Sequence, residues 1–179
     1  GLCTKVCPRE NDNDMSKPKW WYQGWADSEI REYASSGGAA SAIIRAFIKH
    51  GGYVASCLFD SGKFVFEVTN EMAVARKFAG SKYVKSNPEK IYGKIQSLLK
   101  ANQKVLFIGL PCQVAAVNQF IKDKTNLVSA DLICHGTPSP YLLKKCLQEY
   151  GHDINTLTDI NFRIKSLYEL NRDGKPIAA

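Results

Sequence analysis

Two short apolar runs, each ending in a turn with a cysteine, constrain the fold of this chain more than any other feature. The run 105–108 leads into Gly-Leu-Pro-Cys-Gln at 109–113, the first cysteine turn. The run 127–133 leads into Cys-His-Gly-Thr-Pro at 134–138, the second cysteine turn. Between them, residues 113–122 carry apolar side chains at helical spacing. The chain therefore contains a strand, helix, strand unit.

Strands joined by a crossover helix run parallel, so both cysteine turns are expected at the same edge of a sheet. In open α/β sheets, the crevice outside the carboxyl ends of the strands is where ligands bind. Here that crevice would be lined by Cys112, Cys134 and His135. The alternative is that both cysteines are small buried hydrophobic residues, since free cysteine is among the most buried residue types.

Composition and length indicate one globular domain without a membrane span. The chain has 179 residues, of which 45% are hydrophobic and 23% charged, and no apolar run approaches the roughly 20 residues that cross a bilayer. The net charge of +7 comes without a nucleic-acid-binding motif, so it suits an anionic cofactor or an acidic electron-transfer partner better than nucleic acid. Six cysteines in a chain that needs no disulfides indicate metal or redox use in a reducing cytoplasm.

The first eight residues contain the most specific short motif. Cys3 and Cys7, followed by Pro8, match the last half of the bacterial ferredoxin run C-x2-C-x2-C-x3-C-P, which holds a 4Fe-4S cluster. The alternative is two ordinary cysteines in a terminal segment. Because the first two cysteines of such a run would precede Gly1, either the natural protein continues upstream or this chain has lost its cluster. The sequence is expected to be a fragment cut at both ends.

Four regions are predicted along the chain. Residues 1–10 would be the second half of a ferredoxin-type motif, and 11–34 a linker with an aromatic packing segment. Residues 35–163 would form an α/β domain with a partly parallel sheet, a β-hairpin and flanking helices, and 164–179 a polar tail. The three tryptophans of the second region, Trp20, Trp21 and Trp25, are expected to pack the linker onto the domain.

Within the α/β domain, a helix is predicted from Ser35-Ser36-Gly37-Gly38 to about residue 50. Its start would be either an anion site, suited to a phosphate, or a plain serine cap. A hairpin is predicted over 53–69, with Cys57 structural, and a helix from Pro88 to about residue 100. The basic loop between them, with Lys82, would either grip a phosphorylated cofactor or be a solvated turn. A later helix, capped by Ser139, is expected to turn Cys146 towards the core.

These motifs, in this order and spacing, resemble the beta subunit family of coenzyme F420 hydrogenases and dehydrogenases. The likeness rests on the half ferredoxin motif, Ser35–Gly38, the first cysteine turn, and Asp-Leu-Ile-Cys-His-Gly at 131–136 with Pro-Ser-Pro at 138–140. It extends from Gly1 to about Arg163, beyond which the sequence is not expected to follow the family.

The resemblance implies an iron-sulfur flavoprotein oxidoreductase or electron-transfer subunit. Such a protein moves electrons between 4Fe-4S clusters, FAD and coenzyme F420 or a comparable acceptor, and docks on an electron-transfer partner. The resemblance makes Cys3, Cys7, Cys112 and Cys134 the candidate cluster ligands. It makes the following residues candidates for cofactor binding: Ser36, Gly37, Gly38, Lys82, Gly109, Pro111, His135 and Gly136.

Two other functions compete with this interpretation. The first is a hydrolase or transferase with Cys112 or Cys134 as nucleophile and His135 as base, although neighbours in a chain seldom face each other. The second is a zinc-stabilised interaction module that uses Cys3, Cys7 and one or two of the other cysteines. It ranks last, because zinc sites usually show paired C-x2-C spacing and the gap here is C-x3-C.

Overall fold

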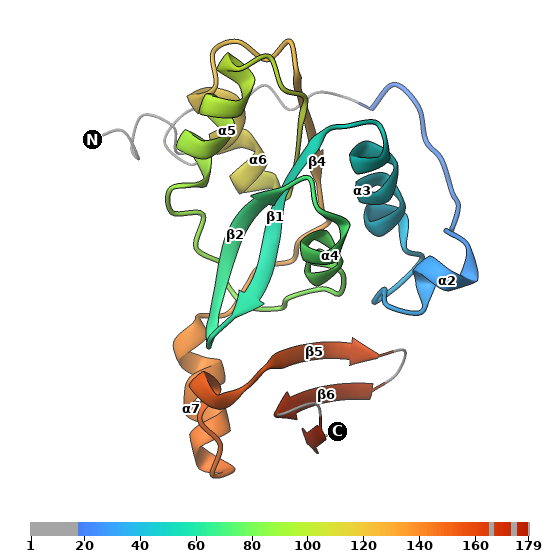
Figure 1. The fold of residues 1–179 in the computed structure, drawn as a ribbon. Helices are drawn as coiled ribbons and strands as arrows, with labels where there is room; N and C mark the ends of the chain where they lie inside the picture. Colours follow the sequence, from blue (N-terminus) through green and yellow to red (C-terminus); the bar gives the residue numbers. More distant parts are fainter. Residues whose placement is uncertain (1–17, 165–166, 173–174, 179) are drawn as a thin grey trace.

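The computed structural model describes residues 18–164, 167–172 and 175–178. Its centre is a four-stranded sheet in the order β2, β1, β3, β4 (Figure 1). The strands are β1 Tyr53–Asp60, β2 Lys63–Thr69, β3 Val105–Gly109 and β4 Leu127–Asp131. β1 and β2 are antiparallel, whereas β3 is parallel to both β1 and β4. The predicted α/β class, with a partly parallel sheet and a β-hairpin, is confirmed.

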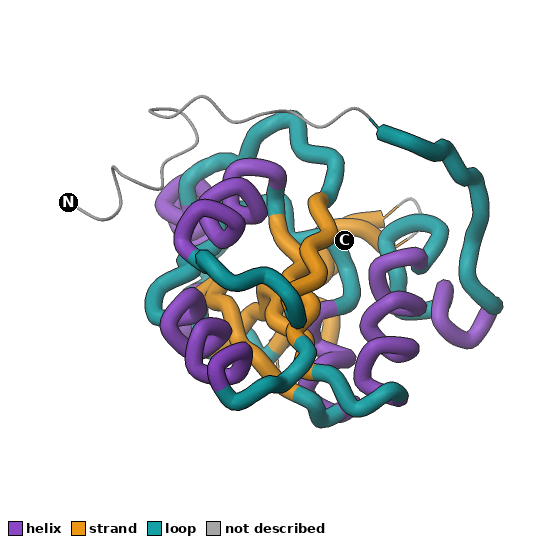
Figure 2. Tube along the Cα trace, turned by 90° about the horizontal axis from the view of Figure 1, so that it is seen from above, coloured by secondary structure: helices purple, strands orange, loops and turns teal. Residues whose placement is uncertain are grey.

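Helices cover both faces of this sheet, as the view from above shows (Figure 2). One face carries α3 and α4, and the other carries α5 and α6. Their bounds are α3 Ala39–Lys49, α4 Met72–Ala75, α5 Ile91–Lys100 and α6 Pro111–Phe120, with the short α2 Ser28–Arg31 and the 3-10 turn η1 Arg76–Phe78 beside them. Both α3 and α5 begin later than the predicted starts at 35 and 88, while α6 begins two residues earlier than predicted.

The core forms on both sides of β3. Val105 and Phe107 point to the α5 and α6 side, whereas Leu106 and Ile108 point to the α3 and α4 side. None of the four is more than 3% exposed. A strand that is buried on both faces needs a continuous apolar run rather than an alternating pattern. Such a run is what predicted β3 from the sequence.

The β1–β2 hairpin turns through Ser61 and Gly62, which have φ values of 48° and 78°. Positive φ at both central residues defines the type I′ turn, whose twist matches that of the strands. A Cβ at Gly62 would also lie 2.7 Å from the side-chain oxygen of Asn155. The predicted hairpin is therefore confirmed, and its tip packs against a later part of the chain.

A second sheet, in the order β5, β6, β7, and helix α7 follow the first sheet along the chain and lie below it in Figure 1. These elements are α7 Pro140–Glu149, the 3-10 turn η2 Ile154–Thr156, β5 Asp159–Ile164, β6 Leu167–Arg172 and β7 Lys175–Ala178. Phe59 and Phe64 of the hairpin share a hydrophobic cluster with Leu147 of α7 and Ile160 of β5. The prediction of a polar tail over 164–179 is wrong, because β6 and β7 lie there.

Two expectations about burial are also wrong. Trp20, Trp21 and Trp25 are 76%, 86% and 73% exposed, so they do not seal the linker onto the domain. Cys146 is exposed, because Leu147 takes the core-facing position of α7. Among the described residues, no helix is long and apolar enough to cross a bilayer.

Candidate functional site

The two cysteine turns lie at the carboxyl ends of neighbouring parallel strands, as predicted. Gly109 and Asp131, the last residues of β3 and β4, are register partners. The Leu132 N–H donates to the Gly109 carbonyl at 2.9 Å, which extends the pairing one residue beyond β4. Cys112 lies in the first turn of α6 and is exposed, while Cys134 is half-buried.

The first cysteine turn is held by the side chain of Gln113, which is only 9% exposed. Its Oε1 accepts the Leu110 N–H at 2.9 Å, which caps the start of α6. Its Nε2 donates to the Ser86 hydroxyl at 3.0 Å. Sequence reasoning missed the role of both side chains. The glutamine three residues after the N-cap was the available signal, because Gln or Glu at that position accepts the N-cap N–H.

Residues 80–87, here called the hub loop, connect the predicted motifs. The Ser81 N–H donates to the Ser35 hydroxyl at 2.7 Å, which joins the loop to the segment before α3. The Lys85 N–H donates to the Pro138 carbonyl at 2.9 Å, which joins it to the second cysteine turn. With the Ser86–Gln113 bond, the loop contacts the segment before α3 and both cysteine turns.

Lys82, in the middle of the hub loop, points inwards rather than towards a ligand. Its Nζ donates to the carbonyls of Lys77, Phe78 and Ala79 at 2.9, 3.0 and 2.6 Å. These carbonyls end η1, where helical partners are lacking. All three N–H bonds of the ammonium are used. Lys82 could bind a phosphate only after one of them breaks, so its predicted role in cofactor binding stays a prediction.

Burial lowers the pKa of Lys82 from its ordinary value of 10.5 to about 8, against the opposing influence of Cys57 and Asp159. Burial also raises the pKa of the neighbouring Cys57 thiol, while the Lys82 cation and the Ser86 hydroxyl oppose that rise. Cys57 is therefore held as a neutral thiol inside the domain. This agrees with its predicted structural role.

The low pKa of Lys82 predicts that the protein becomes more stable between pH 8 and 9. The unfolded chain binds this proton more tightly than the folded protein, so unfolding becomes harder as pH rises towards 10.5. The pH window ends at 9.0, the ordinary pKa of Cys57. Above it the unfolded chain loses the thiol proton more readily than the folded protein, so Cys57 lowers the stability as pH rises. The expected rise in the free energy of unfolding is about 1 kcal/mol. Urea titrations at both pH values measure it.

The matched variant for this test is Lys82→Met, which removes the titrating group and keeps the aliphatic stem. Between pH 8 and 9, the free energy of unfolding of this variant should rise by less than half of the rise in the wild type. An equal rise in wild type and variant would mean that another group causes it.

The segment before α3 is packed rather than open. Gly38 is the N-cap, with φ 78°, and no side chain caps the helix. The predicted serine cap is therefore wrong, because the Ser35 hydroxyl is taken by Ser81. The Ala26 N–H donates to the Gly37 carbonyl at 2.8 Å. A Cβ at Gly38 would lie 3.2 Å from Ala26. The segment 24–31 thus covers part of this helix start.

The second cysteine turn places a backbone donor on its sulfur. The Gly136 N–H lies 3.3 Å from Cys134 Sγ, and the turn needs φ 111° at Gly136. His135 is exposed, and no hydrogen bond in the described part of the chain joins it to Cys112 or Cys134. A nucleophile and base within hydrogen-bond reach, which a thiol hydrolase needs, is not formed here.

The described residues do not form a complete metal site. Nowhere in these ranges do three or more Cys, His, Asp or Glu side chains gather closely enough to hold a metal ion. Cys112 and Cys134 supply two thiols at one edge, fewer than the four ligands of a 4Fe-4S cluster. The predicted ligands Cys3 and Cys7 lie outside the described residues.

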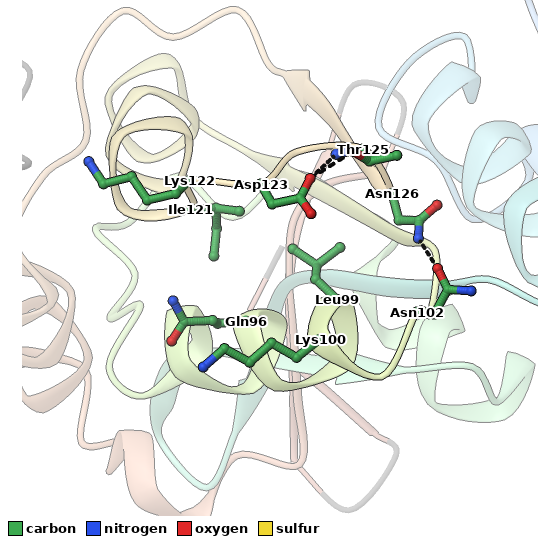
Figure 3. Close-up of a pocket in the computed structure, with 9 residues that line it drawn as sticks. All are labelled: Gln96, Leu99, Lys100, Asn102, Ile121, Lys122, Asp123, Thr125 and Asn126. Atoms are coloured by element: carbon green, nitrogen blue, oxygen red, sulfur yellow. Dashed lines mark hydrogen bonds between the residues drawn. The ribbon is translucent and has the colours of Figure 1, made fainter.

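A groove of about 310 Å³ lies at the opposite edge of the sheet (Figure 3). It opens between the ends of α5 and α6, near the amino ends of β3 and β4. Its lining is mixed, with Leu99 and Ile121 beside Lys100, Lys122 and Asp123. No predicted site residue lines it.

Comparison with known proteins gives one family match. Residues 102–178 match the model of the C-terminal part of coenzyme F420 hydrogenase and dehydrogenase beta subunits. The match includes both cysteine turns and continues through β7. The expectation that the likeness would end near Arg163 is therefore wrong.

Two individual proteins are also similar. The uncharacterized protein MJ1349 of Methanocaldococcus jannaschii is 26% identical over 138 residues, which cover 72% of this chain and 38% of that protein. A chain of the F420-reducing NiFe hydrogenase complex from Methanosarcina barkeri, solved in a xenon derivatization study, has the same fold. Its TM-score is 0.61 at 17% identity, over 84% of this chain and 55% of that chain. This chain thus spans less than two thirds of either relative.

The family match covers both cysteine turns, the fold agrees with that of the hydrogenase chain, and the motif order is that of the resemblance drawn from the sequence. Residues 102–178 thus match the C-terminal part of coenzyme F420 hydrogenase and dehydrogenase beta subunits, and the fold of the chain resembles that of the hydrogenase chain.

Proposed function

We propose that this chain is the cofactor-binding part of an iron-sulfur flavoprotein oxidoreductase or electron-transfer subunit. It moves electrons between 4Fe-4S clusters, FAD and coenzyme F420 or a comparable acceptor. One observation supports this function most. The hub loop contacts the segment before α3 and both cysteine turns, so one loop joins motifs that are far apart in sequence, two of them at the carboxyl ends of the parallel strands β3 and β4. That edge is where α/β sheets bind cofactors.

In this proposal the thiols of Cys112 and Cys134 hold iron. They follow neighbouring strands, and the exposure of Cys112 leaves its sulfur accessible. The Gly136 N–H, 3.3 Å from Cys134 Sγ, suits a thiolate ligand, because such bonds stabilise the negative charge on sulfur and tune the cluster potential. Cys3 and Cys7, with the ferredoxin spacing, hold iron from outside the described residues.

The flavin site in this proposal uses the same edge. Gly109, Pro111, His135 and Gly136 line it from the cysteine turns, and Ser36, Gly37 and Gly38 line it from the start of α3. Lys82 contributes a cation if its bonds to η1 open. A bound flavin exchanges a hydride as two electrons and passes single electrons to iron-sulfur clusters. The chain's own residues orient the two cofactors side by side and keep bulk water from the Gln113 side of the edge, where that side chain is buried.

The proposed partner is an electron-transfer protein or subunit, and the proposed substrate a small redox cofactor. The fold neighbour belongs to a hydrogenase complex, and the net charge of +7 favours an acidic partner surface. The proposed compartment is the cytoplasm. The four cysteines that the structure describes are free thiols, which a reducing environment preserves.

An anaerobic ultraviolet-visible spectrum tests the proposal. The chain is measured before and after reconstitution with iron, sulfide and FAD, and the bound cofactor is identified after acid precipitation. Flavin bands over a broad iron-sulfur shoulder are expected. Cys112→Ser and Cys134→Ser should each lose iron and the shoulder, because serine does not replace a cluster thiolate.

The matched control is Cys146→Ser, which alters an exposed cysteine on α7 that belongs to neither cysteine turn. It should keep the iron content of the wild type. A reconstituted wild-type protein with neither flavin nor iron would overturn the proposal, and so would loss of iron from Cys146→Ser alone.

A further inference from the structure

Gln113 is a buried polar side chain whose two hydrogen bonds connect separate parts of the proposed site. At 9% exposure its amide is largely removed from water, so both of its polar ends need partners. Oε1 accepts from Leu110 within the first cysteine turn, and Nε2 donates to Ser86 in the hub loop. The amide thus links two segments that lie 27 residues apart in sequence.

Through the hub loop, the two hydrogen bonds of Gln113, here called the Gln113 bridge, also connect to other segments. The N–H of Lys85, next to Ser86, donates to the Pro138 carbonyl and so holds the second cysteine turn against the hub loop. Ser81, at the other end of the hub loop, is bonded to Ser35. The first cysteine turn is joined to these segments by Gln113, while the Leu132–Gly109 bond joins the two strand ends directly. A change at Gln113 therefore alters how the first cysteine turn sits against the hub loop.

We propose that Gln113 is a positioning residue of the cofactor site, fixing the Cys112-bearing turn against the hub loop before any cofactor binds. This inference rests on the proposed function for the identity of the cofactor. It adds to that function a residue which need not touch cofactor or iron. Pre-formed geometry raises affinity, because ordering the turn costs free energy before binding rather than during it.

The chemistry of the side chain explains why glutamine suits this position. An amide offers both an acceptor and a donor, one for each partner. Methionine has a similar length and neither hydrogen-bonding group. Space is also restricted, since a Cβ on Gly109 would lie 3.1 Å from the Gln113 Oε1. The side chain therefore fills the gap that Gly109 leaves, and its amide cannot rotate freely there.

The first measurement needs no cofactor. Hydrogen–deuterium exchange of the Leu110 amide reports directly on the Gln113 bridge, because Oε1 is its acceptor. In the full chain, Gln113→Met should speed this exchange by about tenfold, the effect of losing one hydrogen bond. Ser97→Ala removes a hydroxyl that bonds only to Gly93 on the exposed side of α5, and should leave the exchange unchanged.

The second measurement uses FAD as the probe, with flavin fluorescence as the readout of its dissociation constant. Gln113→Met should weaken FAD binding by about tenfold. Ser86→Ala keeps the Leu110 bond and removes the hydroxyl that Gln113 and the Cys57 thiol share, and it should weaken FAD binding several-fold. Ser86→Thr retains a hydroxyl and should restore most of the affinity, while Ser97→Ala should equal the wild type.

The outcomes separate the inference from the proposed function. A wild type that binds no FAD overturns the proposed function and the positioning role together. Unchanged exchange at Leu110 in Gln113→Met overturns the bridge alone. Faster exchange with unchanged FAD affinity in both Gln113→Met and Ser86→Ala overturns the positioning role while the proposed function stands. If Gln113→Met does not fold, Ser86→Ala and Ser86→Thr decide the case.

Discussion

Replacing Phe107 with alanine is expected to lower the free energy of unfolding by about 3–5 kcal/mol, the largest effect of any single change considered. The ring is fully buried in the centre of β3. It stacks on Phe66 at a centroid distance of 5.4 Å and meets the edge of Tyr92 at 6.5 Å. Truncation removes these contacts and leaves a cavity between the sheet and α5. Urea unfolding followed by circular dichroism measures the loss.

The graded control is Phe107→Leu, which keeps most of the volume and should cost less than about 1.5 kcal/mol. Domains of this size have a total stability of roughly 5–15 kcal/mol, so the alanine variant should lose a large share of it and unfold at a clearly lower urea concentration. A loss no larger for alanine than for leucine would show that the surrounding side chains collapse into the space.

Gly109→Ala should destabilise the protein by about 1–3 kcal/mol, a large effect for one added methyl group. The new Cβ would lie 2.9 Å from the Phe107 ring and 3.1 Å from Gln113 Oε1. Neither neighbour can move easily, because the ring is fully buried and the amide is bonded at both ends. The Gly109 carbonyl also accepts from Leu132, so a backbone shift would disturb both cysteine turns. Thermal unfolding measures the change.

Gly93→Ala is the matched control, because no atom lies within 4 Å of the added Cβ in helix α5. It should stabilise the protein by about 0.5–1 kcal/mol, since alanine is the better helix former. The double variant Phe107→Leu/Gly109→Ala should lose less stability than the sum of the two single variants, because leucine vacates part of the space. Strict additivity would refute the predicted clash.

The centre of the fold could be predicted from sequence because its signals are local. The apolar run of β3, the helical spacing of α6 and the Ser-Gly turn of the hairpin each depend on a few neighbouring residues. The parallel arrangement then follows from the crossover helix, and it places Cys112 and Cys134 at one edge. Local pattern and tertiary structure agree in this unit.

The failures come from residues whose surroundings in the fold are not visible in the local sequence pattern. Ser35 has the composition of a helix cap, but its hydroxyl is bonded 46 residues away by Ser81. Lys82 looks like a solvated cation, yet the end of η1 binds its ammonium. The tryptophans were expected to be buried from their hydrophobicity, which cannot tell a core from an exposed segment.

The C-terminal strands were missed although a signal was present. Asp173-Gly174 is typical of two-residue hairpin loops, and it falls between β6 and β7 in the sequence. The polar composition of 164–179 outweighed it in the prediction. Antiparallel sheets commonly have one face in water and accept polar residues on it. A polar composition therefore does not exclude strands.

The hub loop also bears on how distant relatives can share this fold. Two of its three bonds to the surrounding motifs are made by backbone N–H groups, those of Ser81 and Lys85. Every residue except proline supplies such a donor. Evolution can therefore exchange the side chains at these two positions without breaking the bonds that shape the loop. Family members should tolerate sequence drift at 81 and 85 and exclude only proline, whereas the hydroxyl at 86 is bound to its amide partner at 113 and should change together with it.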